Sequence, residues 1–278
     1  MNHNLIKEAS KNVWGTTPAG WTYAENNSKG TQEFFEKVLQ KRFTEECKWM
    51  FEIVQFERFK EKKVLEIGCG AGYDAYQFCK HGAQYTGIDL TPDNPIITKK
   101  HLSYFGYHPE VLEMDAEELS FNEHFDYIFS FGVLHHTPNI KKALKNIYIV
   151  LKDDGEAQII VYNKYSIFYI ITCIGYNWLL KGKFLTMSLK DLRSTIEVTT
   201  STVKPLVNVY SKKELHRLCN QAGFQIIKTD IRKLVREDLP GGTRFGAKLY
   251  KYIPESWLDY FATKFGWYLS VRMVKAKV

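Results

Sequence analysis

The 278-residue sequence predicts an α/β fold, in which a doubly wound and largely parallel sheet carries helices on both faces. Two observations predict it. From Lys62 onward, short apolar runs typical of buried strands alternate with stretches of helical periodicity. The first of these runs leads directly into a glycine-rich turn followed by a helix, and this arrangement is typical of ligand-binding α/β domains.

The expected elements follow one another at regular intervals. Strands are predicted at residues 62–68, 84–90, 109–115, 125–131 and 156–163, and helices at 73–82, 94–106 and 141–151, with a turn at 152–155. A helix at 211–224 that Ser211 caps, and strands at 224–231 and 266–274, would complete a sheet of seven strands.

The chain before Lys62 has a different character. One long helix is expected over 31–59, preceded by an aromatic and turn-rich segment at 12–27. We therefore interpret residues 1–61 as an N-terminal helical cap, or lid, on the main domain. The main domain is expected to cover 62–278, with substrate-side insertions after the fifth and sixth strands at 164–205 and 233–264.

Composition indicates a soluble globular protein, since 45% of residues are hydrophobic and 25% are charged. The five cysteines are scattered and form no CxxC pair, which favours reduced thiols and a cytoplasmic location. The polar N-terminus lacks the apolar core of an export signal. The apolar stretch at 165–180 is shorter than the roughly 20 residues of a membrane span. It is expected to be a buried or pocket-covering helix, with contact at a membrane surface as the alternative.

Positive charge is concentrated in the C-terminal third. The net charge is +7, and residues 181–278 contain 19 Lys or Arg against 8 Asp or Glu. Such a region suits a phosphorylated or otherwise anionic small molecule, a nucleic acid or an anionic lipid surface. A solvated face without any partner explains it equally well.

The glycine-rich turn has the pattern E-x-G-x-G-x-G. Glu66 ends the first strand, and Gly68, Gly70 and Gly72 allow the backbone to approach a ligand closely. A nicotinamide or flavin site would favour G-x-G-x-x-G, but position 73 is Tyr.

Two acidic residues stand where the next two strands end. A carboxylate at Asp89 can accept hydrogen bonds from ribose hydroxyls, and one at Asp115, beside Ala116, can accept from an adenine amino group. Alone, each would be read as a helix cap or turn residue. Because ligands bind outside the carboxyl ends of parallel strands, their spacing makes the two acids reinforce each other.

In order along the chain, VLEIGCGAG, YTGIDL, MDAEEL, FDYIFSFGVLHHTPN and LKDDGEAQIIVYN resemble the class I S-adenosylmethionine (SAM)-dependent methyltransferases, especially the small-molecule group called methyltransferase type 11. The resemblance covers about residues 60–163 and, more weakly, YSKKELHRLCNQAGF. It implies a Rossmann-like sheet whose last strand is antiparallel, SAM as cofactor and S-adenosylhomocysteine (SAH) as product. The cofactor residues that it implies are Glu66, Gly68, Cys69, Gly70 and Gly72 for the methionine part, Asp89 for the ribose, Leu90, Asp115 and Ala116 for the adenine, and Phe131 for the ammonium group.

His135 and His136 leave the fourth strand beside this site. Two interpretations stay open. A histidine can pack on the cofactor or in the turn before Pro138, or it can act as the general base that removes a proton from the acceptor. No metal site is expected, because adjacent histidines seldom face one ion and no Cys, His or acidic partner stands at ligand spacing.

Large aromatic residues of the cap suggest an acceptor pocket. Trp14, Trp21 and Tyr23 are expected to close over the cofactor or simply to anchor the cap, and Arg42 and Tyr162 are further candidates for substrate contact. The predicted function is O- or N-methylation of a small molecule such as a sugar, a glycan or lipid precursor or a secondary metabolite, with an anionic or lipid-linked acceptor among the options.

The alternatives are an RNA methyltransferase, a nicotinamide oxidoreductase and a non-catalytic SAM-binding partner protein. Against an RNA methyltransferase, the sequence has no NPPY-type motif and no catalytic cysteine motif, and its basic residues do not interleave with aromatic ones. A nucleic-acid substrate is therefore not expected. The oligomeric state is left open.

Overall fold

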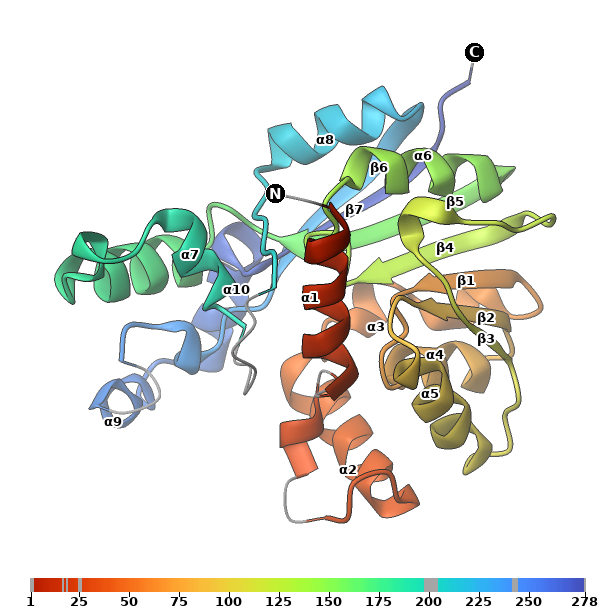
Figure 1. The fold of residues 1–278 in the computed structure, drawn as a ribbon. Helices are drawn as coiled ribbons and strands as arrows, with labels where there is room; N and C mark the ends of the chain where they lie inside the picture. Colours follow the sequence, from red (N-terminus) through yellow and green to blue (C-terminus); the bar gives the residue numbers. More distant parts are fainter. Residues whose placement is uncertain are drawn as a thin grey trace.

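The computed structural model describes residues 3–16, 18, 20–24, 27–197, 205–241 and 245–277. Seven strands form one sheet in the order β3-β2-β1-β4-β5-β7-β6 (Figure 1). They are β1 (Lys63–Ile67), β2 (Gln84–Asp89), β3 (Glu110–Glu113), β4 (Phe125–Phe131), β5 (Leu151–Tyr162), β6 (Phe224–Arg232) and β7 (Tyr268–Lys275). The first five are parallel, and β7 lies antiparallel between β5 and β6. The predicted Rossmann-like sheet with an antiparallel last strand is confirmed.

Helices cover both faces of the sheet. On one face lie α4 (Tyr73–Lys80) and α5 (Asp93–Ser103), and on the other α6 (Ile140–Val150) and α8 (Lys212–Gln221) (Figure 1). Leu144 and Ile147 of α6 pack with Leu215 of α8 in a core that includes the inner side chains of β4 and β5. Ser211 caps α8 with a reciprocal capping box, as its place in the sequence predicted.

The N-terminal segment shares its core with the sheet. The ring of Phe59 stacks on Tyr127 of β4, with centroids 3.9 Å apart, and Phe56 meets Phe78 of α4 at 4.8 Å. These side chains are buried. These aromatic contacts therefore hold the N-terminal segment against β4 and α4.

The single helix predicted over 31–59 is wrong. The structure has α2 (Gln32–Lys41), a π-helical turn η2 (Arg42–Glu46), a short α3 (Met50–Ile53) and a 3₁₀ turn η3 (Phe56–Phe59). Gln55 adopts a left-handed conformation that an uninterrupted helix excludes. The π-turn widens the helix where Arg42 must reach Asp74 of α4, and such turns commonly occur at functional sites.

The turn-rich segment expected near residue 12 is also different in the structure. Helix α1 (His3–Thr16) runs across the carboxyl end of the sheet, and a short 3₁₀ turn η1 (Trp21–Ala24) follows (Figure 1). Glycine and proline around positions 15–20 suggested a flexible lead-in, but they end the helix instead of preventing it.

A turn was expected at 152–155, but these residues extend β5 instead. Phe125 pairs with Leu151 and Tyr127 pairs with Glu156, so the register between β4 and β5 shifts across this stretch. The extra residues form an irregularity within the strand, as a β-bulge does.

Both predicted insertions contain helices on one side of the molecule. After β5 come η5 (Phe168–Leu180), η6 (Lys183–Leu185) and α7 (Leu189–Ser194), and after β6 come η7 (Arg236–Asp238), α9 (Phe245–Tyr250) and α10 (Glu255–Phe265) (Figure 1). Helix η5 is only partly the buried helix expected, because Tyr169, Thr172 and Cys173 are buried while Ile171 and Leu180 are exposed. The described helices include none with the length and apolar content needed to cross a bilayer.

Candidate functional site

A cavity of about 500 Å³ lies at the carboxyl ends of the parallel strands. Ile67 of β1, Asp89 of β2 and Phe131 of β4 line its floor, while α1, η1 and η2 form its roof. This is the edge at which open parallel sheets bind ligands. Most of the residues predicted for the site meet here, namely Gly68, Gly70, Asp89, Leu90, Asp115, Ala116, Phe131, His136, Trp14, Trp21, Tyr23, Arg42 and Tyr162.

The three glycines of the turn have different local roles. All three have positive φ, which favours glycine. A Cβ at Gly68 would lie 2.1 Å from Val133 Cγ2, and one at Gly72 would lie 2.8 Å from Thr98 Cγ2, so both positions need glycine for packing. A Cβ at Gly70 would meet no atom within 4 Å and would project into open space beside the cavity. Gly70 is therefore the position at which the chain leaves room for a ligand.

The carboxylate of Asp89 stabilises the same turn. Its Oδ2 accepts a hydrogen bond from the Gly70 backbone N–H at 2.9 Å, and its Oδ1 accepts from the backbone N–H and the hydroxyl of Thr91. Asp89 thus joins the end of β2 to the turn after β1. It lines the cavity, and its contact with a ribose stays a prediction.

Asp115 has a partner that the sequence did not reveal. Its Oδ2 lies 2.5 Å from the Nζ of Lys7 on α1, and its Oδ1 accepts from the backbone N–H of Glu117. Lys7 also reaches Glu117 at 3.0 Å. Burial alone would lower the pKa of Lys7, but the bonds to these two carboxylates outweigh it and raise that pKa. The ion pairs anchor α1 over the loop predicted to bind adenine.

His136 is oriented like a general base. Its Nδ1 lies 2.6 Å from the backbone oxygen of Leu206 and must donate there, because a carbonyl can only accept. In the neutral ring this leaves the lone pair on Nε2, which has no hydrogen-bond partner among the described residues. The ring lines the cavity and lies 5.3 Å from that of Trp14. Burial lowers the pKa of His136, and nearby Glu197 only partly opposes this effect, so the ring is neutral at pH 7.

His135 has a different environment. It is fully buried and does not line the cavity, and its ring packs against that of Tyr162 with centroids 3.7 Å apart and planes tilted by 33°. Burial, followed by the proximity of His136, lowers its pKa well below the ordinary value. The geometry therefore separates the two histidines, and only His136 faces the cavity.

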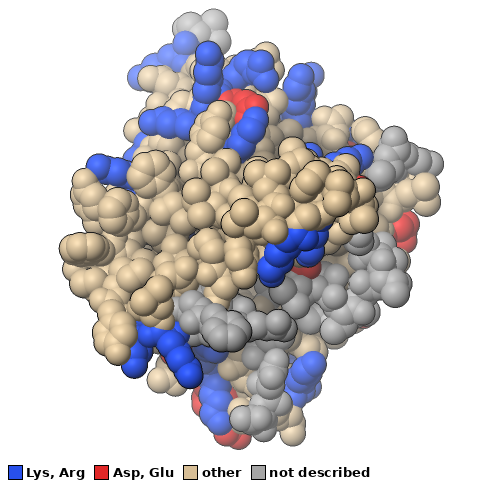
Figure 2. Space-filling model, turned by 90° about the vertical axis from the view of Figure 1, so that its left-hand side faces the viewer, with Lys and Arg blue, Asp and Glu red and all other residues tan. Residues whose placement is uncertain are grey.

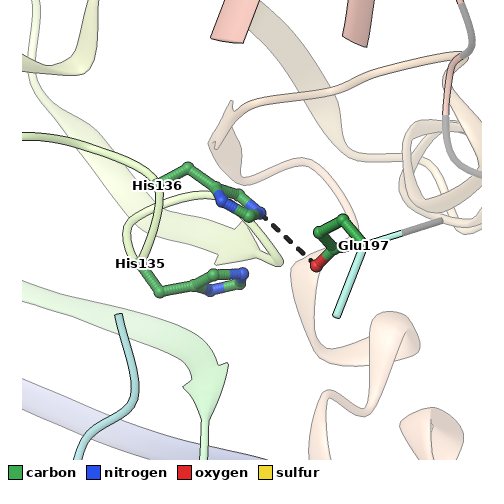
Figure 3. A group of neighbouring side chains, drawn as sticks. All are labelled: His135, His136 and Glu197. Carbon is green, nitrogen blue, oxygen red and sulfur yellow. Dashed lines mark ion pairs between the residues drawn. The ribbon is translucent and has the colours of Figure 1, made fainter. Parts of the chain in front are cut away.

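Glu197 joins the two histidines in one cluster. The potential ligand atoms of the three residues lie within 4.8 Å of one another, and the Glu197 carboxylate lies 3.8 Å from His136 Nε2 (Figure 3). The spacing of residues in the sequence did not reveal Glu197 as a neighbour of the histidines, because only the fold brings the segment after α7 next to them. Glu197 also accepts a hydrogen bond from the Tyr162 hydroxyl. The cluster can stabilise a protonated His136, and its donor set would also admit a metal ion.

The far end of the cavity combines aromatic walls with buried charges. Phe168, Trp267 and Tyr268 line it together with Tyr162, whose ring stacks on Trp267 at 4.2 Å. Lys233 lies there 3.8 Å from Asp238. Burial alone would lower the Lys233 pKa, but Asp238, Glu46 and other neighbouring groups raise it, so this amine stays charged.

Arg42 is committed to a structural contact. Its guanidinium forms two hydrogen bonds with the Asp74 carboxylate, of 3.0 and 2.7 Å, and lies 5.2 Å from the Phe131 ring. The group lines the cavity, yet its strongest donors point to Asp74. Lys233, which the sequence did not single out, is the freer cation at this end.

Four predicted residues do not line the cavity: Glu66, Cys69, Gly72 and His135. Glu66 is buried and accepts a hydrogen bond from the Tyr85 hydroxyl at 2.6 Å. The residues that sequence reasoning missed include Lys7, Ser10, Glu46, Glu197, Lys233, Asp238, Trp267 and Tyr268. No local pattern in the sequence marks these residues.

The cavity fits a polar ligand. The Ser10 hydroxyl and the indole N–H groups of Trp14 and Trp21 are buried in its lining without a partner in the described part of the chain. Buried polar groups nearly always have partners. Together with the open space at Gly70 and the carboxylate of Asp89, they suit a ligand with a sugar and further polar groups.

Comparison with known proteins decides the family. A family model described as a methyltransferase domain matches residues 38–229, which is more than half of the chain. The chain belongs to the SAM-dependent methyltransferases. The predicted family, enzyme class and cofactor are thereby confirmed.

Individual relatives agree with this result. An uncharacterized protein of Methanocaldococcus jannaschii is 30% identical to this chain over 256 residues, which are 88% of this chain and 92% of that protein. The ubiquinone biosynthesis O-methyltransferase of Haemophilus ducreyi is 31% identical over 126 residues, which are 43% of this chain and 53% of that enzyme.

Solved structures share the fold. A SAM-dependent methyltransferase from Clostridium acetobutylicum superposes with a TM-score of 0.57 at 12% identity, over 88% of this chain and 99% of that one. The 1,6-didemethyltoxoflavin-N1-methyltransferase of Burkholderia thailandensis, solved with bound 1,6-didemethyltoxoflavin and SAH, superposes with a TM-score of 0.55 at 15% identity, over 100% of this chain and 92% of that one.

Proposed function

We propose that this methyltransferase O-methylates a ring-bearing small molecule and that His136 removes the proton from the acceptor hydroxyl. The observation that carries the proposal is the His136 imidazole, which lines the cavity. Its Nδ1 donates to Leu206, while its buried Nε2 lies 3.8 Å from the Glu197 carboxylate and has no hydrogen-bond partner among the described residues. An N–H donated to a fixed acceptor holds the ring in the tautomer that a base needs.

The residues that would hold SAM are those whose geometry fits it. Gly70 leaves open space at the turn, Asp89 faces the cavity in position for the ribose, and Asp115 and Ala116 line the adenine side. The bound cofactor supplies a methyl group on a positively charged sulfur, already activated for displacement. We further propose that α1, held by Lys7, is the lid that covers the adenine side.

The protein then needs to align the acceptor and exclude water. Tyr162, Trp267 and Tyr268 offer flat apolar surfaces against which a ring can lie. His136 Nε2 accepts the acceptor proton, and Glu197 at 3.8 Å stabilises the resulting imidazolium. The charge of Lys233 favours an anionic group elsewhere on the acceptor, with Asp238 and Glu46 nearby to fix its orientation.

The relatives support O-methylation in a limited way. Ubiquinone biosynthesis O-methyltransferases are similar to this chain over 126 residues, which are 43% of its length. The fold also carries N-methylation in the Burkholderia neighbour. The His136 geometry favours oxygen, because a neutral amine can attack without prior loss of a proton whereas a hydroxyl benefits from a base.

The test is transfer of labelled methyl groups from SAM to a metabolite extract, followed by mass spectrometry of the product. We expect label in a small molecule, at oxygen, that survives RNase treatment and disappears with His136→Asn. Label recovered only in RNA, or a methylated nitrogen formed equally well by the variant, would overturn the proposal.

A further inference from the structure

The two insertions form a face with an unusual density of exposed apolar side chains. Of 20 large apolar side chains that are exposed in the described part of the chain, 14 belong to residues 165–189 and 249–265. Leu180 is 81% exposed and Leu185 is 77% exposed, while Trp257 of α10 is 63% exposed. Isolated exposed apolar residues are ordinary, but a concentration of this size indicates an interaction surface.

These residues lie on the same side of the molecule. Figure 1 shows η5, α7, α9 and α10 projecting together from the sheet. Ile167, just before η5, packs against Leu258 and Ala262 of α10, and Thr172 of η5 donates a hydrogen bond to the Asp238 backbone oxygen. Figure 2 views the molecule from this side and shows a broad surface without charge. We call it the insertion face.

Positive charge surrounds the insertion face. Figure 2 shows blue side chains at its border and few red ones. Six exposed lysines of the same segments contribute, namely Lys181, Lys183, Lys190, Lys248, Lys251 and Lys264. Two carboxylates of α10 have partners elsewhere, since Glu255 pairs with Arg236 and Asp259 with Lys48.

We propose that the insertion face docks on the surface of an anionic lipid bilayer. Apolar side chains surrounded by lysines suit a lipid surface, because the former enter the acyl boundary while the ammonium groups meet acidic headgroups. Trp257, Tyr252 and Tyr260 add aromatic rings, which prefer the interfacial zone. Helix η5 has 13 residues, so it lies in the interface and does not cross the bilayer.

Charge also argues against a second copy of the chain as the occupant. A symmetric dimer through the insertion face would bring the lysines of both copies to the edge of one interface, and like charges brought together oppose association. A bilayer rich in anionic lipid complements the same lysines.

Docking in this orientation has a consequence for the active site. Phe168 of η5 lines the aromatic end of the cavity, and so do Lys233 and Asp238 from the second insertion. The two insertions that carry the face thus also contribute side chains to this end of the cavity. The proposal does not depend on the acceptor's identity, but it places this end of the cavity next to the membrane.

The test is co-sedimentation of the full chain with vesicles of phosphatidylcholine, alone or with about one-third phosphatidylglycerol, at low and high salt. We expect binding to the anionic vesicles only, weakened by salt. Changing Lys181, Lys183 and Lys190 together to Glu should reduce the affinity about 100-fold or more, because each lysine near an anionic surface contributes roughly a factor of five. The matched control changes Lys99, Lys141 and Lys145 on α5 and α6 to Glu and should bind like wild type.

A second arm tests the apolar contribution. Leu180→Ser with Leu185→Ser should also reduce vesicle binding, and quenching of tryptophan fluorescence by brominated lipids should fall in Trp257→Phe. SAH binding by each variant shows that it is folded, so loss of vesicle binding is separate from loss of cofactor binding. Wild-type protein that ignores anionic vesicles would overturn the proposal, and so would equal binding by the lysine variant. A dimer in light scattering that the Leu180 and Leu185 changes dissociate, without vesicle binding, would assign the face to self-association instead.

Discussion

Alanine at Gly70 and at Gly68 should separate cofactor binding from folding. Both residues have positive φ, of 55° and 79°, and an L-residue there costs about 1–2 kcal/mol. At Gly68 the added Cβ would also lie 2.1 Å from Val133 Cγ2, and such overpacking costs about 1–3 kcal/mol more. At Gly70 the Cβ meets nothing within 4 Å of the protein, so only the backbone strain remains.

We therefore expect Gly68→Ala to lose about 2–5 kcal/mol of unfolding free energy and Gly70→Ala about 1–2 kcal/mol. The two substitutions should rank differently in their effect on SAH affinity. Gly70→Ala should weaken SAH binding at least tenfold although the protein is well folded, because its methyl group occupies space at the cavity. Urea unfolding measures the stability without ligand, and titration calorimetry measures the SAH affinity.

Gly106→Ala is the matched control. Gly106 has φ of 79° and also open space at its Cβ position, but it lies outside the cavity. It should lose the same small amount of stability and keep its SAH affinity. SAH binding by Gly70→Ala within twofold of wild type would refute the assignment of this turn to the cofactor.

The remaining predictions concern four other features of the site. Asp89→Ala should weaken SAH binding about 10- to 100-fold, since hydrogen bonds to a charged group contribute about 1.5–3 kcal/mol each, and unchanged calorimetry would contradict the ribose assignment. His136→Asn should reduce turnover roughly 100-fold or more while SAH affinity survives. Because burial lowers the His136 pKa, the wild-type rate should be constant above pH 6.5 and should fall at lower pH as the base is protonated. Rates of methyl transfer measured from pH 5 upward should show no such fall in His136→Asn. EDTA should leave the rate unchanged, whereas a loss that one divalent metal restores would make the His135, His136 and Glu197 cluster a metal site. Burial lowers the His101 pKa to about 4, so as pH falls the unfolded chain binds a proton at this residue before the folded chain does. The free energy of unfolding should therefore be greatest above pH 6.5 and about 3 kcal/mol smaller by pH 4. Urea titrations should show a smaller loss in His101→Phe.

His101 shows why the cap and the cofactor turn are linked. Its Nδ1 donates to the Ala71 backbone oxygen at 2.7 Å, and its ring stacks on Phe35 of α2 at 4.2 Å. One buried side chain thus supports the glycine turn from below and holds the cap in place. Its polarity and helical position gave no sign of this role, because both partners are distant in sequence.

The sequence by itself determined the sheet and predicted most of the residues that line the cavity at the ends of its strands. Strand periodicity is local, and a glycine that must adopt positive φ, such as Gly70, or an acid at a strand end, such as Asp89, stands beside the element that places it. These signals need no knowledge of distant contacts. The breaks in the helix predicted over 31–59 could not be predicted locally, because the π-turn accompanies a contact between Arg42 and Asp74 of α4, which is distant in sequence.

Only the tertiary structure decided which side chains line the far end of the cavity and which of the two histidines lines it. Lys7, Glu197 and Lys233 reach the cavity from three segments far apart in the chain, and no local pattern marks them. His135 and His136 are neighbours of one residue type, yet one packs on Tyr162 and the other donates to Leu206. Packing and hydrogen-bond partners, which form only when the chain folds, set which imidazole lines the cavity.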